Sequence, residues 1–114
     1  MRPVFPGVEV FRAISSPTRR ALLDKLSSRE QSVQRLAASF EMSLPAVSQQ
    51  LAILRQAGLV TSRQAGRWRV YRLNAEPLRD VMAWLKTYER FFAVRLPDLG
   101  QDLQQVAPEE LRWR

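Results

Sequence analysis

The chain has 114 residues and a formal net charge of +7, with 18 lysines and arginines against 11 acidic residues. It contains no cysteine and no histidine, which excludes disulfides, Cys/His zinc sites and catalysis by Ser/His or Cys/His groups within this chain. Only carboxylates remain as metal ligands and they form no dense cluster, so we expect no metal, no cofactor and no enzymatic activity.

The excess positive charge is concentrated in one part of the sequence. Residues 17–72 carry ten basic residues against three acidic ones, whereas residues 73–114 carry six against seven. A segregated basic excess is typical of a segment that binds a polyanion. Nearly all the basic residues are arginines, which fits phosphate contacts and equally fits a GC-rich genome.

The first half of the chain predicts a loose arm followed by three helices. Residues 1–7 hold two prolines and a glycine and form the expected arm. A short helix follows, with Val8, Phe11 and Ile14 on one face, and then Ser16 and Ser32 cap the next two helices. The apolar residues expected to face inward are Ala21, Leu22 and Leu26 in the second helix and Val33, Leu36, Ala37 and Phe40 in the third.

A fourth helix is predicted from Ser43 to Ala57, after a turn at Glu41-Met42. Ser43 can cap its amide groups, and Gly58 can end it in a left-handed conformation. Val47, Leu51 and Leu54 recur at helical spacing and share one face. The opposite face is small, polar and uncharged, which suits the floor of a DNA major groove, where amides pair with adenine. Taken alone, this segment could also be an ordinary core helix.

A β-hairpin should follow, with strands at Leu59–Gln64 and Arg67–Leu73 and a tip at Ala65-Gly66. The arginines around the tip favour contacts with phosphate or the minor groove over a purely solubilising role. We expect Trp68 to pack under the hairpin, because a single aromatic residue is a poor stacking platform for bases.

The last predicted helix begins at Pro77 and ends before Pro97. Its apolar stripe, with Trp84 and Phe91 beside it, is larger than one small domain needs to bury. Dimer packing is the first interpretation, and a ligand pocket within that interface is the alternative. Residues 97–114 are expected to form a tail or a short helix. No segment approaches the ~18 apolar residues of a membrane span, and the N-terminus lacks the apolar core of a signal peptide, so we expect a cytoplasmic protein without membrane contact.

Three strings in this order, SSPTRRALLDKL, SVQRLAASFEMSLPAVSQQLAILRQAGLV and SRQAGRWRVYRLN, resemble the ArsR/SmtB family of bacterial winged-helix repressors. The resemblance covers residues 10–95. Its most specific part is S-x-P-A-V-S-Q-x-L-x-x-L-R-x-A-G-L-V leading into G-R-x-x-x-Y-R-L. The chain departs from the family at Gln50, where many members carry histidine, and at Leu44, where a polar residue is common. The family's metal-binding cysteines and histidines are absent, which places the chain in a branch that does not sense metals.

The resemblance implies a mainly α fold with a β-hairpin wing over residues 8–96, a winged helix-turn-helix that dimerises through its terminal helices. It implies a repressor that binds an inverted-repeat operator in double-stranded DNA as a homodimer and excludes polymerase sterically. Candidate DNA-binding residues are Ser43, Leu44, Pro45, Ser48, Gln49, Ala52, Arg55, Arg19, Arg20, Arg63, Arg67 and Arg69. Candidate dimer-interface residues are Val8, Phe11, Ile14, Leu78, Val81, Met82, Leu85, Tyr88 and Phe92.

Two alternatives stay open at this point. The same fold could be a protein-interaction module, which would bind duplex DNA without steep salt dependence, or an RNA-binding module, which would prefer structured RNA to a palindromic duplex. An effector, whether a small molecule or another protein, is not specified by the residues.

Overall fold

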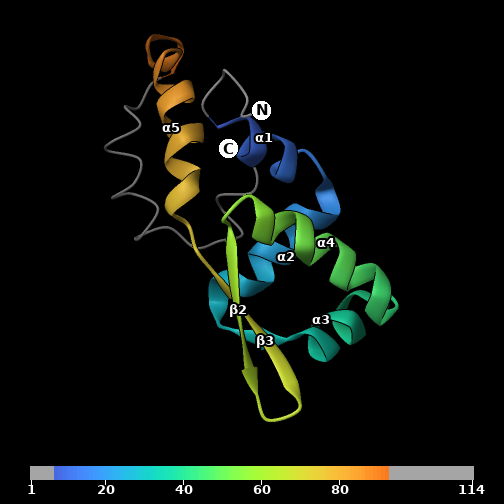
Figure 1. The fold of residues 1–114 in the computed structure, drawn as a ribbon. Helices are drawn as coiled ribbons and strands as arrows, with labels where there is room; N and C mark the ends of the chain where they lie inside the picture. Colours follow the sequence, from blue (N-terminus) through green and yellow to red (C-terminus); the bar gives the residue numbers. More distant parts are fainter. Residues whose placement is uncertain (1–6, 93–114) are drawn as a thin grey trace. The chain divides into compact units, whose positions relative to one another are not determined.

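The structure, a computed structural model, describes residues 7–92 (Figure 1). The predicted arm at residues 1–7, apart from Gly7, and the predicted tail at residues 97–114 lie outside the described residues. The chain divides into two units, one ending at Val81 and the other beginning at Met82. In chain order the main elements are α1 (Val8–Ile14), α2 (Pro17–Ser28), β1 (Gln31–Ser32), α3 (Val33–Phe40), α4 (Leu44–Gln56), β2 (Val60–Ala65), β3 (Trp68–Leu73) and α5 (Arg79–Lys86).

Three serines begin three of these helices in the same way. The hydroxyl of Ser16 accepts a hydrogen bond from the amide of Arg19 at 3.3 Å. Ser32 and Ser43 each accept from the amide three residues on, at 3.2 Å. An N-cap of this kind satisfies one amide that has no partner within the helix. The predicted starts of α2, α3 and α4 are confirmed.

The end of α4 is also as predicted. Gly58 has φ +78°, a left-handed conformation that costs glycine little. Its amide donates to the carbonyl of Arg55 at 2.9 Å, and the amide of Leu59 donates to the carbonyl of Leu54 at 3.0 Å. Both bonds supply partners to carbonyls in the last turn of the helix. The chain therefore leaves α4 in a fixed direction and enters β2.

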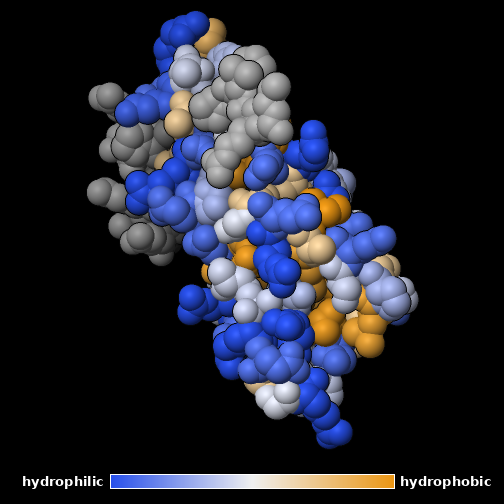
Figure 2. All heavy atoms as spheres, viewed as in Figure 1, coloured by the Kyte–Doolittle hydropathy of each residue, from blue (hydrophilic) through white to orange (hydrophobic). Residues whose placement is uncertain are grey.

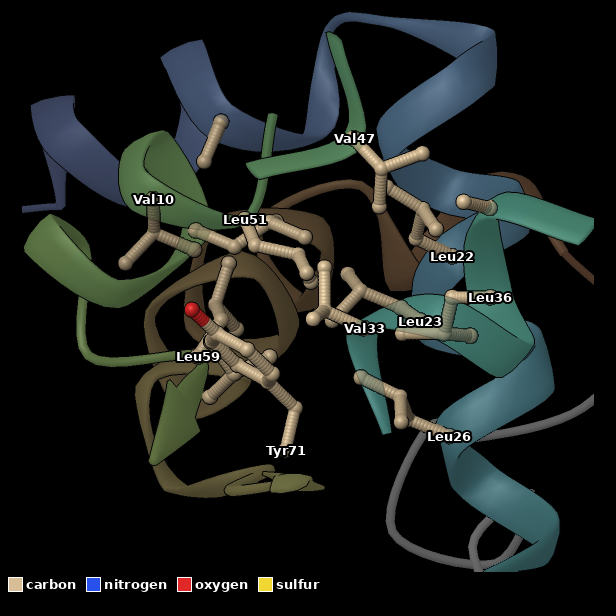
Figure 3. Packing of buried hydrophobic residues seen from close by; sticks show 14 residues of the cluster. Val10, Leu22, Leu23, Leu26, Val33, Leu36, Val47, Leu51, Leu59 and Tyr71 are labelled. Carbon is tan, nitrogen blue, oxygen red and sulfur yellow. The ribbon is translucent and has the colours of Figure 1, made fainter. Parts of the chain in front are cut away.

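The core of the first unit combines helices and hairpin, as Figure 3 shows for Leu22, Leu36, Leu51 and Leu59. All four side chains are fully buried. The predicted apolar face of α4 is confirmed, because Val47, Leu51 and Leu54 are each 0% exposed. Truncating one such leucine to alanine costs ~2–5 kcal/mol of stability. The helix is therefore held firmly from one side, and its opposite side is free for another role. The remaining buried residues are Val10, Ala13, Leu23, Leu26, Val33, Ala37, Val60 and Tyr71.

The hairpin is part of a three-stranded antiparallel sheet with strand order β1-β3-β2. The two-residue strand β1 was not predicted, because so short a segment carries no alternating pattern. The tip lies one residue later than predicted, between Ala65 and Trp68, which are paired in the register. Gly66 has φ +63° there, which explains the glycine.

The prediction for Trp68 was wrong. Its side chain is 43% exposed and does not pack under the hairpin. The register explains why: neighbouring residues of β3 face opposite sides, and Tyr71, three positions away, takes the buried side. Trp68 therefore lies with Val70 and Arg72 on the other face of the sheet.

The prediction of one long helix from Pro77 to Pro97 was also wrong within the described residues. A 3-10 turn, Glu76–Leu78, precedes α5, which ends at Lys86 and is followed by a second 3-10 turn, Glu89–Phe91. The hydroxyl of Thr87 donates to the carbonyl of Trp84 at 2.7 Å, and its amide donates to the same carbonyl at 3.1 Å. This side-chain competition for a helix carbonyl, together with the bonding to the third residue back, ends the α-helix.

Candidate nucleic-acid interface

The helix α4 presents one exposed stripe opposite its buried face. Pro45, Ser48, Gln49 and Ala52 are all exposed and follow one another at spacings of three, one and three residues. Arg55 and Gln56 continue the stripe toward the end of the helix. The structure thus brings the predicted base-contacting positions onto one surface. The stripe consists of small, amide and hydroxyl side chains and ends in an arginine, so a large flat polar partner can approach closely.

The start of α4 contributes Ser43 and Leu44, both exposed. Ser43 uses one lone pair for the cap bond to Ala46, so its hydroxyl proton is still available to an acceptor. Partial positive charge collects at a helix N-terminus, which favours anions near Ser43. Leu44 is 43% exposed and can offer only an apolar contact.

Two adjacent glutamines of α4 have different environments. Gln49 is exposed, and within residues 7–92 its amide has no hydrogen-bonding partner. Gln50 is half-buried, and its Oε1 accepts a hydrogen bond from Nη1 of Arg19 at 3.0 Å. Of these two glutamines, only Gln49 therefore has its donors and acceptor available to a ligand on the exposed stripe.

Two arginines converge beside this stripe. Nη1 of Arg55, in α4, lies 3.5 Å from the hydroxyl oxygen of Ser62, and Nη1 of Arg69, in β3, lies 3.4 Å from the same atom. Within residues 7–92 neither guanidinium forms an ion pair. Two cations held together by one neutral hydroxyl form a site of uncompensated positive charge, which attracts an anion such as phosphate. Ser62 was not singled out from the sequence; the strand register, which sets it on the same face as Arg69, is what identifies it.

The other predicted arginines of the hairpin lie elsewhere on it. Arg63 is paired with Val70 across the sheet, on the face opposite Ser62, and forms an ion pair with Glu30. Arg67 lies at the tip, with its guanidinium carbon 5.6 Å from the centre of the Trp68 ring. Figure 2 shows hydrophilic side chains gathered where Figure 1 places the tip of the hairpin. The hairpin is basic on both faces, but only Arg69 shares a cluster with α4.

The two predicted arginines of α2 differ from each other. Arg19 is turned into the protein, and its Nε, Nη1 and Nη2 all donate to protein acceptors. Arg20 is exposed and donates from Nη1 to the carbonyl of Ile14 at 2.8 Å. The structure therefore groups Arg20 with the exposed cations and separates Arg19 from them.

The described residues contain few other chemical groups that could define a site. No group of three or more His, Cys, Asp or Glu side chains gathers there around a point that could hold a metal ion. No helix within the described part of the chain is long and apolar enough to cross a membrane. Within the described residues, the exposed stripe of α4 with its adjoining arginines is therefore the candidate site.

Comparison with known proteins identifies the same region. A family model described as bacterial regulatory protein, arsR family, matches residues 16–62. The transcriptional repressor SdpR of Bacillus subtilis (strain 168) is 37% identical over 79 residues, which cover 69% of this chain and 88% of that protein.

Solved structures share the fold. The crystal structure of an ArsR family transcriptional regulator matches with a TM-score of 0.66 at 33% identity, covering 76% of this chain and 90% of that one. The solution structure of the homodimeric winged helix-turn-helix DNA-binding domain of Mb0332 from Mycobacterium bovis matches with a TM-score of 0.59 at 29% identity. That match covers 70% of this chain and 74% of the other. These structures confirm the predicted winged helix-turn-helix, with α3 and α4 as the helix pair and β2–β3 as the wing.

Proposed function

The chain belongs to the ArsR family of bacterial transcriptional regulators, and from that premise we propose that it is a repressor that binds an inverted-repeat operator as a homodimer. Its relatives are DNA-binding regulators and not enzymes. The observation that carries the proposal is the exposed stripe of α4 beside the paired cations Arg55 and Arg69.

The stripe divides into a part that would read bases and a part that would hold the backbone. Ser43, Ser48 and Gln49 would contact base edges, since an amide can bond an adenine through both of its polar atoms. Leu44, Pro45 and Ala52 would pack against the groove, where small or apolar side chains allow close approach. Because base contacts carry the sequence information, Gln49 is the main candidate for specificity.

Arginines around the stripe would bind phosphates. Arg55 and Arg69 converge on the hydroxyl of Ser62 and form no ion pair within residues 7–92. Arg20 in α2 and Arg67 at the hairpin tip are further exposed cations. Arg63 could join them only by leaving Glu30. Arg19 is left out of this set, because its guanidinium is partly buried and is held by the carbonyls of Arg12 and Ala13 and by Oε1 of Gln50.

A homodimer would supply two such surfaces related by a two-fold axis. The Mb0332 domain is homodimeric. In the second unit of this chain Met82, Trp84, Tyr88, Phe91 and Phe92 are 43–66% exposed, a large apolar area for a monomer to leave in water. We propose the dimer surface given by the sequence: Val8, Phe11, Ile14, Leu78, Val81, Met82, Leu85, Tyr88 and Phe92. Half-sites would then lie about one helical turn of DNA, or a multiple of it, apart.

The proposed setting is the cytoplasm, where a bacterial operator is found. Repression would follow from steric exclusion of polymerase. A response to soft metals is not part of the proposal, because the chain has no cysteine or histidine to bind them. An effector, if one acts, would be a small molecule or a protein.

Selection of bound fragments from the source genome tests the proposal. The full chain is incubated with fragmented genomic DNA, bound fragments are sequenced, and a shared motif is measured by fluorescence anisotropy over a salt series. We expect an inverted repeat that binds far better than one half-site or a random duplex, with affinity falling steeply as salt rises. Fragments without a common motif, or binding that is insensitive to salt, would favour an interaction module instead.

A further inference from the structure

One side chain connects three helices of the first unit. Arg19, in the first turn of α2, donates from Nε to the carbonyl of Ala13 at 2.7 Å and from Nη2 to the carbonyl of Arg12 at 3.1 Å. Its Nη1 donates to Oε1 of Gln50, in α4, at 3.0 Å. A single guanidinium thus bonds to the last turn of α1 and to the middle of α4.

Arginine suits this position for physical reasons. The last carbonyls of α1 have no partner within their own helix, and a cation near a helix C-terminus is stabilised by the helix dipole. The guanidinium fork presents its donors in fixed directions, so binding at α1 also fixes where Nη1 points. Arg19 and Gln50 are both partly buried, which limits competition from water and strengthens the bond between them.

The contact lies directly behind the proposed reading face. Gln50 follows Gln49 in α4, and neighbouring helix residues project about 100° apart around the axis. Holding the side chain of Gln50 against Arg19 therefore adds a directional restraint on the rotation of α4 to the packing of its buried face. That rotation decides which way Gln49 points.

We propose that Arg19 and Gln50 form a positioning contact that sets the rotation of the recognition helix, so that Arg19 governs operator specificity without touching DNA. The inference rests on the proposed function, in which α4 reads the operator. Arg19 also holds the last turn of α1, and α1 carries three residues of the proposed dimer surface, Val8, Phe11 and Ile14. A shift of α1 on dimerisation would consequently reach α4 through Arg19.

The test compares operator with random duplex DNA of the same length in a salt series, using the full chain. The variants are Arg19→Met and Gln50→Met, which keep side-chain length but remove the bond, and the double variant. Lys25→Met is the matched control, because Lys25 is an exposed cation of the same helix and lies outside the proposed DNA-binding set. Gln50→Glu tests rescue, because it retains an acceptor for Arg19.

We expect each methionine variant to lower the operator-to-random affinity ratio about tenfold, with no greater loss in the double variant, as for residues that act through one contact. Gln50→Glu should restore the ratio, even if its charge weakens binding to both DNAs equally. Because a positioning residue binds no phosphate, Arg19→Met should leave the slope of log affinity against log salt unchanged.

Three outcomes would overturn the proposal. The first is a slope reduced by ~0.9 in Arg19→Met with equal loss on both DNAs, which would make Arg19 a phosphate contact. The second is a folded Gln50→Met that keeps the wild-type ratio, and this arm decides the matter if Arg19→Met does not fold. The third is a double variant whose loss of the operator-to-random ratio equals the sum of the two single losses in free energy, which would mean that Arg19 and Gln50 act independently. If the wild-type protein has no operator preference at all, the proposed function itself fails. If the wild-type protein prefers its operator and the methionine variants keep that preference, only the positioning contact fails.

Discussion

Arg55 and Arg69 come from different elements, the end of α4 and the wing, yet both guanidinium groups point at the hydroxyl of Ser62. Two like charges repel, and a hydroxyl compensates neither of them. A phosphate placed between the two groups would convert that repulsion into two charge-assisted hydrogen bonds. The two arginines therefore form one candidate phosphate site, to which both α4 and the wing contribute.

Arg69→Ala should therefore weaken binding to operator and random DNA alike. Loss of one phosphate contact is expected to lower the slope of log affinity against log salt by ~0.9. Arg72→Ala is the matched control, because Arg72 is exposed on the same strand but faces the other side of the sheet. Anisotropy titrations at several salt concentrations measure both effects. Equal slopes for the two variants would remove Arg69 from the backbone contacts.

Gln49→Ala should act on sequence preference. An amide paired with a base discriminates by ~1–3 kcal/mol, so operator affinity should fall by that amount while random-DNA affinity hardly changes. Gln56→Ala, at the far end of the same exposed stripe, is the control and should preserve the preference. Competition titrations with operator duplexes altered at single base pairs would locate the lost contact. A uniform loss on all duplexes would instead assign Gln49 to the backbone.

The sequence predicted features that depend on neighbouring residues, and it missed features that depend on residues far apart in the chain. Serine caps and the spacing of Val47, Leu51 and Leu54 are local, and both predicted α4 correctly. The bond between Arg19 and Gln50 joins residues 31 positions apart, and no local pattern indicates it. An exposed arginine and an internally bonded one look alike in a sequence.

Errors in the hairpin and the last helix have the same origin. Packing of Trp68 under the wing was predicted because a single aromatic residue is a poor stacking platform for bases, whereas the register, set by pairing with β1 and β2, gave the buried position to Tyr71. The apolar stripe continues past Lys86, but the Thr87 hydroxyl bonds the carbonyl of Trp84 and the helix stops there. In both places tertiary or side-chain hydrogen bonding overrode the hydrophobic pattern.

Glu30→Gln should raise affinity for all DNA. Glu30 neutralises Arg63, so the substitution removes one negative charge and frees one cation on the wing. Because both partners are substantially exposed, folding stability should change by less than ~1 kcal/mol. Urea unfolding and salt-dependent anisotropy test the two statements separately. Unchanged DNA affinity at low salt would show that this face of the wing lies away from the duplex.

Glu41→Gly should stabilise the fold by up to about 1 kcal/mol, because relief of left-handed strain, ~1–2 kcal/mol, exceeds the ~0.5–1 kcal/mol cost of glycine's freedom in the unfolded chain. Glu41 ends α3 with φ +52°, a left-handed conformation that costs a residue with a side chain more than it costs glycine. It occupies the turn between the two helices of the helix-turn-helix, and its amide and that of Met42 already bond the last carbonyls of α3. Glu41→Ala is the control, since alanine keeps the strain. If alanine stabilised as much as glycine, the effect would come from charge and not from backbone strain.

Met82→Glu should give a monomer that no longer binds its operator tightly. Met82 is 45% exposed, so a charge there leaves the fold of the single chain intact while opposing burial of an apolar surface against a second copy. Each half-site alone is weak, and linking two recognition helices raises affinity by their effective concentration. Dissociation should therefore cost far more operator affinity than random-DNA affinity.

Lys86→Glu, at an exposed polar position in the same helix, serves as the control. Light scattering at micromolar protein, with anisotropy on the same samples, follows assembly and binding together. A wild-type monomer that binds its operator tightly would refute the proposed dimer, and a dimeric Met82→Glu would move its interface away from this side of α5.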